Sequence, residues 1–440
     1  HLSISNDIKL LLDIQDENIY FEENAVEYKE FKGKTAKFIT GKLTYTPSHC
    51  ECCGVKNENY TIYKNGTKTS RITLPFTGIY PTYLLLKKQR FFCKACNSTF
   101  IAKSSVVERH CFISKQTRAQ VLIKSADTQT ITSISHDCSV SPSTVQRIIS
   151  EEVKPYKFSY NSLPEHLSFD EFRYGKGKFA FEYINAETGE ILGILSSRDG
   201  YTVKNHFYAN YSLKQLNKVK TITIDMNSSY IGVIKEVFPH AEIIIDRFHL
   251  VQLINRSMNK TRVRIMNQIK TSNNEDMKKY RRIKRYWKLI LKNRMDLTYT
   301  EYKYYRLFGQ RTEAGIVDEM LNYDVKLKEN YTIYQQLLFC IKTDDYSGLE
   351  KILQAKQSDF LSQYMKTSIK TLKKHLPYIK NTFKYPFNNG RIEGINNKIK
   401  ILSRIVYGYR NFVNYKNRIL LHFKCKPIIE NEKLRHSHAT

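Results

Sequence analysis

Two pairs of cysteines restrict how the first hundred residues of this chain can fold. Cys50-Glu-Cys-Cys53 and Cys93-Lys-Ala-Cys96 each place two thiols on one short turn, and residues 54–92 separate the pairs. Four thiolates suit the tetrahedral coordination of Zn²⁺. The pattern therefore predicts one Zn²⁺ that draws the two turns together, with the ligands Cys50, Cys53, Cys93 and Cys96.

The residue after each pair supports this interpretation. Gly54 follows the first pair and Asn97 the second, and these residue types tolerate the positive φ that such a turn needs. Gly54 also favours Cys53 over Cys52 as the ligand. We interpret residues 49–100 as a zinc ribbon. Two alternatives are buried or redox-active thiols, and replacement of one ligand by a histidine, His49 or His110.

The charge of the chain points to a polyanionic partner. Its 440 residues include 71 Lys and Arg but only 42 Asp and Glu, which gives a net charge of +29. Nucleic acid is the usual partner of so basic a protein. No apolar run approaches the roughly 20 residues that a membrane span needs. We therefore expect a cytoplasmic, nucleoid-associated protein whose nine cysteines serve as metal ligands or free thiols.

Residues 101–155 have the pattern of a helix-turn-helix DNA-binding domain. Helices are expected over 116–125 and 131–136, followed by a turn and a third helix over 143–152. Ser141 is suited to cap that helix, with Pro142 at its first position. The alternative is a helical hairpin without a DNA-binding role. The side chains expected to read the major groove are Ser143, Thr144, Gln146 and Arg147.

After a linker, the pattern changes to mixed α/β structure. Strands are expected over 167–172, 178–185, 190–196, 221–225 and 242–246, with a hairpin turn at 186–189 and a helix over 228–238. A helical, initially very basic segment follows, with fifteen Lys or Arg and two acidic residues in 247–294. It is too long for a connection inside one domain, so we interpret it as an all-helical insertion.

The insertion is expected to divide the α/β domain into two segments. The expected order is a 1–48 lead-in, the zinc ribbon, the helix-turn-helix domain, a first α/β segment (166–250), the insertion (251–380), a second α/β segment (381–425) and a 426–440 tail. The second α/β segment begins with an Asn388-Asn-Gly390 turn and a helix from Arg391. Asn411 is suited to cap a last helix that runs to about Phe423.

Three acidic residues in the α/β region suggest phosphodiester chemistry. Asp170 lies within the first strand, Asp225 ends a later strand, and Glu393 lies in the first turn of a helix. Two Mg²⁺ ions held by such carboxylates can activate one oxygen and stabilise another. Glu171 alternates with Asp170, so only one of them is expected to be a ligand. Alternatively, each aspartate is a solvated strand residue and Glu393 complements its helix dipole.

The order of the motifs resembles the insertion-sequence transposases of the ISL-three group, within the DDE superfamily. The resemblance rests on the cysteine pairs, the helix-turn-helix and the segments Leu167–Phe172, Thr223–Tyr230, Asp246–His249 and Asn388–Lys398. It implies an RNase H-like catalytic domain. It also implies that two Mg²⁺ or Mn²⁺ ions are held by Asp170, Asp225 and Glu393.

Further roles follow from the same resemblance. Asp246 and His249 would support the site, although His249 can instead be a core histidine. Trp287 would stack on a flipped base, although it can also be a core residue of its helix. Phosphate contacts in the insertion are expected from Arg262, Arg264, Arg281, Arg282 and Arg285.

The resemblance implies a transposase that binds the inverted-repeat ends of an insertion sequence, then cleaves and transfers DNA strands. Because two DNA ends must be brought together, it implies a homodimer or larger assembly on double-stranded DNA. One alternative is a DNA-binding regulator without catalysis. Another is an RNase H-like nuclease that cuts without strand transfer.

Overall fold

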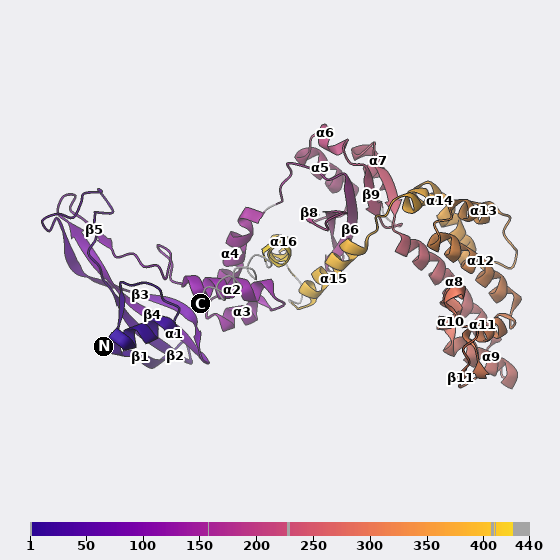
Figure 1. The fold of residues 1–440 in the computed structure, drawn as a ribbon, viewed down its shortest axis with the longest axis horizontal. Coiled ribbons are helices and arrows are strands. Elements are labelled where there is room, and N and C mark those ends of the chain that lie inside the picture. Colours follow the sequence, from indigo (N-terminus) through magenta and orange to yellow (C-terminus); the bar gives the residue numbers. More distant parts are fainter. Residues whose placement is uncertain (1, 157, 227–228, 406–408, 410, 426–440) are drawn as a thin grey trace. The chain divides into compact units, whose positions relative to one another are not determined.

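The computed structural model describes residues 2–156, 158–226, 229–405, 409 and 411–425, so the expected tail at 426–440 lies outside the described residues. The chain forms two compact units, one of residues 1–157 with 399–440 and one of residues 158–398. The elements of each unit are labelled in Figure 1. No helix in the described ranges is long and apolar enough to cross a bilayer.

A five-stranded sheet begins unit 1. Helix α1 (Leu2–Leu11) precedes strands in the order β1-β2-β4-β3, with β5 paired to β4. The β1–β2 hairpin falls in the stretch interpreted as a lead-in, yet β2 pairs with β4 in the same sheet as the cysteines. The strands are β1 (Ile19–Phe31), β2 (Lys34–Leu43), β3 (Ile62–Thr77), β4 (Tyr80–Cys93) and β5 (Ser98–Ile101).

Three short helices follow, close to the predicted positions. They are α2 (Lys115–Ala126), α3 (Ile131–Asp137) and α4 (Pro142–Val153), with a 3₁₀ turn η1 (Lys154–Tyr156) after them. The predicted cap is confirmed, because the Ser141 side chain accepts a hydrogen bond from the Thr144 N–H (3.1 Å) and Pro142 begins α4.

The C-terminal helix completes this helical group. Asn411 caps α16 (Phe412–Leu420), as predicted, and a π-helical turn η3 (Leu421–Cys425) follows. The Arg418 side chain is buried and donates to two carbonyl oxygens just beyond α2, those of Asp127 (2.9 Å) and Gln129 (2.8 Å). Arg418 therefore ties α16 to the segment that follows α2.

Unit 2 is built on a mixed sheet with the order β10-β9-β6-β7-β8. Strands β6, β7 and β8 are antiparallel neighbours, whereas β9 and β10 run parallel to β6. The predicted strand and hairpin order is confirmed. The strands are β6 (His166–Gly175), β7 (Lys178–Asn185), β8 (Ile191–Leu195), β9 (Thr221–Ile224) and β10 (Glu242–Ile245).

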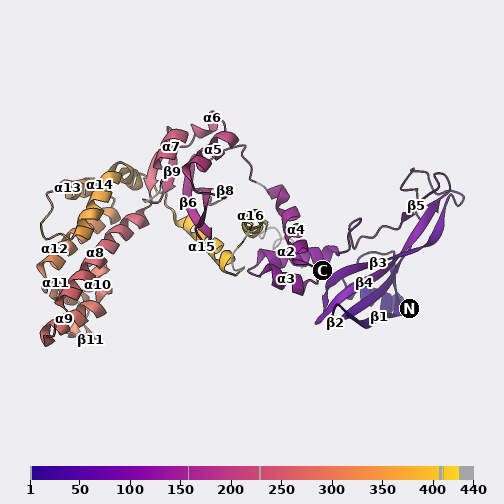
Figure 2. The ribbon, with the colours of Figure 1, turned by 180° about the vertical axis from the view of Figure 1, so that it is seen from behind.

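Helices cover both faces of this sheet. Phe169 of β6 stacks on Phe207 of α5, so α5 lies on the face toward which Phe169 points. On the opposite face, α15 runs beside β6 (Figures 1 and 2), and Asn396 of α15 reaches Asp170. The helices are α5 (Gly200–Asn210), α6 (Leu213–Leu216), α7 (Ile231–Val237) and α15 (Gly390–Ile405); α5 and α6 were not predicted.

The insertion is mainly helical, but the expectation that it is all-helical is wrong. Strands β11 (Lys303–Tyr305) and β12 (Gly309–Arg311) form a small hairpin, whose turn uses Gly309 at φ +69°. The other elements are α8 (Arg247–Ile269), α9 (Asn274–Arg285), α10 (Trp287–Leu291), η2 (Arg294–Asp296), α11 (Glu313–Leu321), α12 (Val325–Lys342), α13 (Tyr346–Gln354) and α14 (Gln363–Lys384).

The last insertion helix returns the chain to the sheet. The Asn381 amide donates to the Ile243 carbonyl (2.9 Å), and the Thr382 hydroxyl donates to the Ile245 carbonyl (2.7 Å). Both carbonyls belong to β10, the edge strand. Strand β10 is thus covered rather than left open to association, and the chain re-enters the sheet region just before α15.

The contact between Arg418 of α16 and the segment that follows α2 gives a test of this arrangement. We expect Arg418→Met to destabilise the helical group by roughly 1–3 kcal/mol, because two partly buried hydrogen bonds to the segment after α2 are lost. In the full chain, amide hydrogen exchange of α2–α4 should therefore accelerate roughly tenfold. Arg404→Met, at an exposed position, is the control. Equal exchange in the two variants would show that Arg418 does not hold these helices.

Candidate active site and zinc site

The four predicted zinc ligands come together in unit 1. The sulfur atoms of Cys50, Cys53, Cys93 and Cys96 all lie within 4.8 Å of one another. The Sγ atoms of Cys50 and Cys96 are 3.8 Å apart, as are those of Cys53 and Cys93. Four thiols converging from two turns suit a tetrahedral ion, so the cluster is consistent with zinc.

The backbone of the two turns explains why these cysteines were recognisable. Gly54 has φ +74° and Asn97 has φ +53°, the positive values predicted for the residues after each pair. Burial raises the pKa of the Cys50 thiol, but hydrogen bonds from the Cys53 and Cys52 backbone N–H groups outweigh it and lower the pKa to about 6. These N–H groups favour the thiolate that a metal binds. Cys52 is exposed and lies outside the cluster.

In unit 2, the pairing of β6 with β9 brings Asp170 and Asp225 together. The strands are parallel, and Ser168 lies opposite Thr223, two residues before each aspartate. Both aspartates line one cavity of about 740 Å³. The strand pairing therefore brings two of the predicted acids to the same cavity.

The Asn388-to-Lys398 segment supplies amide donors to these acids. The Asn389 side chain donates to Asp225 Oδ1 (3.1 Å), and its backbone N–H donates to Asp246 Oδ1 (3.0 Å). Farther along α15, the Asn396 side chain donates to Asp170 Oδ2 (2.6 Å). Neither asparagine was among the predicted site residues, although both lie in the motif that carried the resemblance.

Glu393 lies between these asparagines in sequence and joins a second group of ligands. Its carboxylate, a carboxylate oxygen of Asp246 and a ring nitrogen of His249 are all within 4.8 Å of one another. His249 Nε2 is also 2.9 Å from Asp225 Oδ2. His249 therefore connects the Asp225 side of the site to the Glu393 side.

Burial raises the pKa values of two aspartates in this acidic cluster, Asp170 and Asp225. Desolvation, with the nearby Asp225 carboxylate, raises the pKa of Asp170 to about 6. Desolvation also raises the pKa of Asp225, against the opposing effects of His249 and the Asn389 amide. Bringing positive charge to the site would offset these costs, as a divalent cation does.

Glu182 is a buried acid that the sequence analysis missed. It lies opposite Asp170 in the β6–β7 pairing and is fully buried. Desolvation, with the Asp170 carboxylate, raises its pKa well above the usual value. Its signal was visible as a lone acid inside the apolar run Phe179-Ala-Phe-Glu-Tyr-Ile184.

Glu171 takes a different role from its neighbour Asp170. It pairs with Arg198, and the Tyr230 hydroxyl donates to its carboxylate (3.3 Å). All four residues line the same cavity. The expectation that only one of Asp170 and Glu171 is a ligand is compatible with this division, because an arginine already neutralises Glu171.

The predicted DNA-reading residues lie at the start of α4. Ser143, Gln146 and Arg147 are exposed there. Thr144 is half-buried, and its hydroxyl is 2.9 Å from that of Ser141. Arg147 also forms an ion pair with Glu151 one turn later (2.9 Å).

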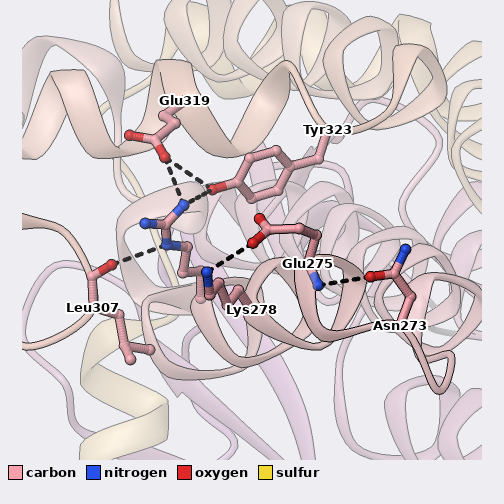
Figure 3. Close-up of polar contacts among 7 residues, drawn as sticks. Asn273, Glu275, Lys278, Leu307, Glu319 and Tyr323 are labelled. Carbon is pink, nitrogen blue, oxygen red and sulfur yellow. Dashed lines mark hydrogen bonds and ion pairs between the residues drawn. The ribbon is translucent and has the colours of Figure 1, made fainter.

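The insertion arginines divide into two groups. Arg262 is buried and donates to Asn259 Oδ1. Arg282 donates to the Glu319 carboxylate (2.7 Å), the Tyr323 hydroxyl and the Leu307 carbonyl, the three partners labelled in Figure 3. The guanidinium groups of these two arginines thus hold the insertion together. Of the five predicted arginines, Arg264, Arg281 and Arg285 are exposed, and Trp287 is also partly exposed.

Zinc content tests the cysteine cluster. We expect Cys93→Ser to lose the bound zinc, because it removes one of four converging thiolates. Cys52→Ser should retain one zinc per chain, since Cys52 lies outside the cluster. Metal analysis of the two purified variants compares them directly. Equal zinc in both would contradict the assignment.

The raised pKa of Asp170 predicts a pH-dependent stability. The ionised carboxylate disfavours the folded state, because the folded pKa of about 6 exceeds the ordinary value of 3.8. This penalty is absent below pH 3.8 and complete above about pH 6. Without added divalent ions, Asp170→Asn should therefore stabilise the protein at pH 7.5 by about 2–3 kcal/mol and have little effect near pH 4. Thermal denaturation at both pH values checks this, and a destabilised variant at pH 7.5 would contradict it.

Comparison with known proteins agrees with this geometry. Residues 46–96 match the family described as the zinc-finger of transposase IS204/IS1001/IS1096/IS1165. The transposase for insertion sequence element IS1001 of Bordetella parapertussis is 25% identical over 394 residues, covering 88% of this chain and 91% of that protein.

A second relative is similar over a shorter stretch. It is named "ATP-dependent protease", from Lactococcus lactis subsp. lactis, and is 38% identical over 110 residues. The match covers 25% of this chain and about a third (35%) of that protein. Residues 167–419, more than half of the chain, match the transposase family DDE_Tnp_ISL3. This protein therefore belongs to the ISL3 family of DDE transposases.

Proposed function

We propose that this chain binds the terminal inverted repeats of an insertion sequence and catalyses DNA strand cleavage and strand transfer. The observation that carries the proposal is the convergence of three separate elements on one acidic site. Strands β6 and β9 supply Asp170 and Asp225 to one cavity. Helix α15 supplies Glu393, which lies beside His249, itself next to Asp225.

The sheet supports an RNase H-like assignment for residues 166–250 with 381–398, the part of the second α/β segment that lies in unit 2. Three antiparallel strands are followed by two strands parallel to the first, in the order β10-β9-β6-β7-β8. The first strand is central and carries Asp170. A helix from the far end of the chain then crosses the face of that strand, which explains how a long insertion can separate Asp225 from Glu393.

The donor set fits divalent metal ions. Asp170, Asp225 and Glu393 would hold two Mg²⁺ or Mn²⁺ ions, which when bound would activate the attacking oxygen and stabilise the leaving oxygen. The protein's own task is to fix the carboxylates. The Asn396 and Asn389 amides each donate to one oxygen of Asp170 and Asp225. The other oxygen of Asp170 accepts the Glu171 N–H (2.7 Å), and that of Asp225 lies 2.9 Å from His249 Nε2.

DNA binding is proposed to involve both units. The zinc ribbon and the helix-turn-helix would recognise the inverted repeats, with Ser143, Gln146 and Arg147 exposed at the start of α4. Arg264, Arg281 and Arg285 would contact phosphates, while Arg262 and Arg282 support the insertion fold. Trp287, 37% exposed, is available to stack on a base. Since two DNA ends must be held together, we propose a homodimer or larger assembly.

A cleavage assay tests the proposal. Purified protein with Mg²⁺ and inverted-repeat DNA should nick at the element end and produce a free 3′-OH. Asp225→Ala should abolish detectable nicking but retain DNA binding, because it removes a ligand and leaves the binding surfaces intact. Asp318→Ala, which changes an exposed acid of the insertion, is the matched control and should nick normally.

A second substrate separates transposition from simple hydrolysis. Pre-cut ends with a 3′-OH, supplied with target DNA, should yield joined products in the parent protein and the Asp318→Ala control. Cutting without joining would favour an RNase H-like nuclease. Binding without cutting would favour a DNA-binding regulator. Undiminished cutting by Asp225→Ala would overturn the assignment of the site.

A further inference from the structure

Asp246 is a buried acid whose second oxygen has no partner. The residue is only 3% exposed. Its Oδ1 accepts the Asn389 N–H, but Oδ2 has no hydrogen-bond partner among the residues that the structure describes. Asp246 precedes α8, yet its side chain makes no capping hydrogen bond to that helix. The usual reason for an acid at a helix start therefore does not account for this carboxylate.

His249, one turn into α8, is similarly placed. Its Nε2 lies 2.9 Å from Asp225 Oδ2. However, neither ring nitrogen forms an aligned hydrogen bond with any residue in the described ranges. A core histidine normally has its ring nitrogens satisfied. Here a ring nitrogen instead lies within 4.8 Å of the ligand oxygens of Asp246 and Glu393.

We propose that Asp246, His249 and Glu393 form a divalent-metal site with mixed nitrogen and oxygen ligands, which selects Mn²⁺ or another first-row ion over Mg²⁺. Asp246 and His249 lie at the junction of β10 and α8, whereas Glu393 lies on α15. The ligand set is therefore complete only when the chain has returned from the insertion to the sheet. The inference rests on the proposed function in one respect, because Glu393 is a ligand in both.

The ligand chemistry explains the selectivity. Mg²⁺ takes oxygen ligands and keeps its octahedral water shell. Imidazole nitrogen binds first-row transition ions more strongly, in the order that rises from Mn²⁺ toward Cu²⁺. An ion here would also satisfy the unpaired Asp246 oxygen. Asp170 is not part of this group of three. The preference for a first-row ion therefore applies to the ion held by Glu393 and not to an ion held by Asp170.

The nitrogen ligand gives a spectroscopic test. Mn²⁺ is added to the full-length, zinc-loaded protein, and pulsed electron paramagnetic resonance measures ¹⁴N coupling to the bound ion. We expect ¹⁴N coupling in the parent protein and its loss in His249→Gln. The dissociation constant for Mn²⁺ should also rise at least roughly tenfold, since loss of even an indirect partner of a metal ligand costs 10–100-fold.

His240→Gln, at an exposed position that precedes β10 in the chain, is the matched control and should keep both the coupling and the affinity. Asp246→Asn should weaken Mn²⁺ binding but retain ¹⁴N coupling, which reports on the site even if His249→Gln folds poorly. Absence of ¹⁴N coupling in the parent protein, or its persistence in His249→Gln, would overturn the inference. Nicking in Mg²⁺ tests the proposed function separately, so either can fail alone.

Discussion

The parallel pairing of β6 with β9 is the contact on which the catalytic unit depends. Its register places Ser168 opposite Thr223, so Asp170 and Asp225 follow on neighbouring strands. Alternation along β6 then directs Phe169 into the aromatic core against α5 and Asp170 toward α15. A shift of one residue would exchange these faces and bury the carboxylate among aromatic rings. The apolar core thus fixes the position of the acids.

Amide donors, rather than cationic side chains, hold the acids in place. An arginine beside Asp170 would stabilise the carboxylate but would also compete with a metal ion for its oxygens. The Asn396 and Asn389 amides satisfy one oxygen each without neutralising the charge. The cost of burying two ionised carboxylates therefore remains. It appears as the raised pKa values of Asp170 and Asp225. The negative charge of these carboxylates is therefore not neutralised by the amides, and a bound cation would offset it.

Local chemistry explains which features could be predicted from the sequence. The cysteine pairs, the positive φ values at Gly54 and Asn97, and the Ser141 cap all depend on residues close in sequence. Strands ending in acids were equally recognisable. The grouping of Asp170, Asp225 and Glu393 into one catalytic site stays a prediction from the family resemblance, because spacing alone does not show which strands are neighbours.

The missed features depend on contacts between distant segments. Arg418 satisfies carbonyls beyond α2, almost three hundred residues before it in the chain. Asn396 and Glu182 approach Asp170 from separate elements. The insertion arginines show the same limit. From composition alone, Arg262 and Arg282 are simply two positive charges. The fold shows that their guanidinium groups donate to Asn259 and Glu319 within the insertion.

The separation of charges follows from the two demands on this protein. DNA phosphates require an exposed positive surface, whereas metal ions require carboxylates that no arginine or lysine has already neutralised. Among the residues that the structure describes, no Lys or Arg forms an ion pair with Asp170, Asp225 or Asp246. The basic side chain that does approach one of these acids is His249, whose Nε2 lies 2.9 Å from Asp225 Oδ2. Exposed arginines instead lie elsewhere, on insertion helices at Arg264, Arg281 and Arg285 and on α4 at Arg147. A net charge of +29 can therefore coexist with an acidic site that remains open to cations.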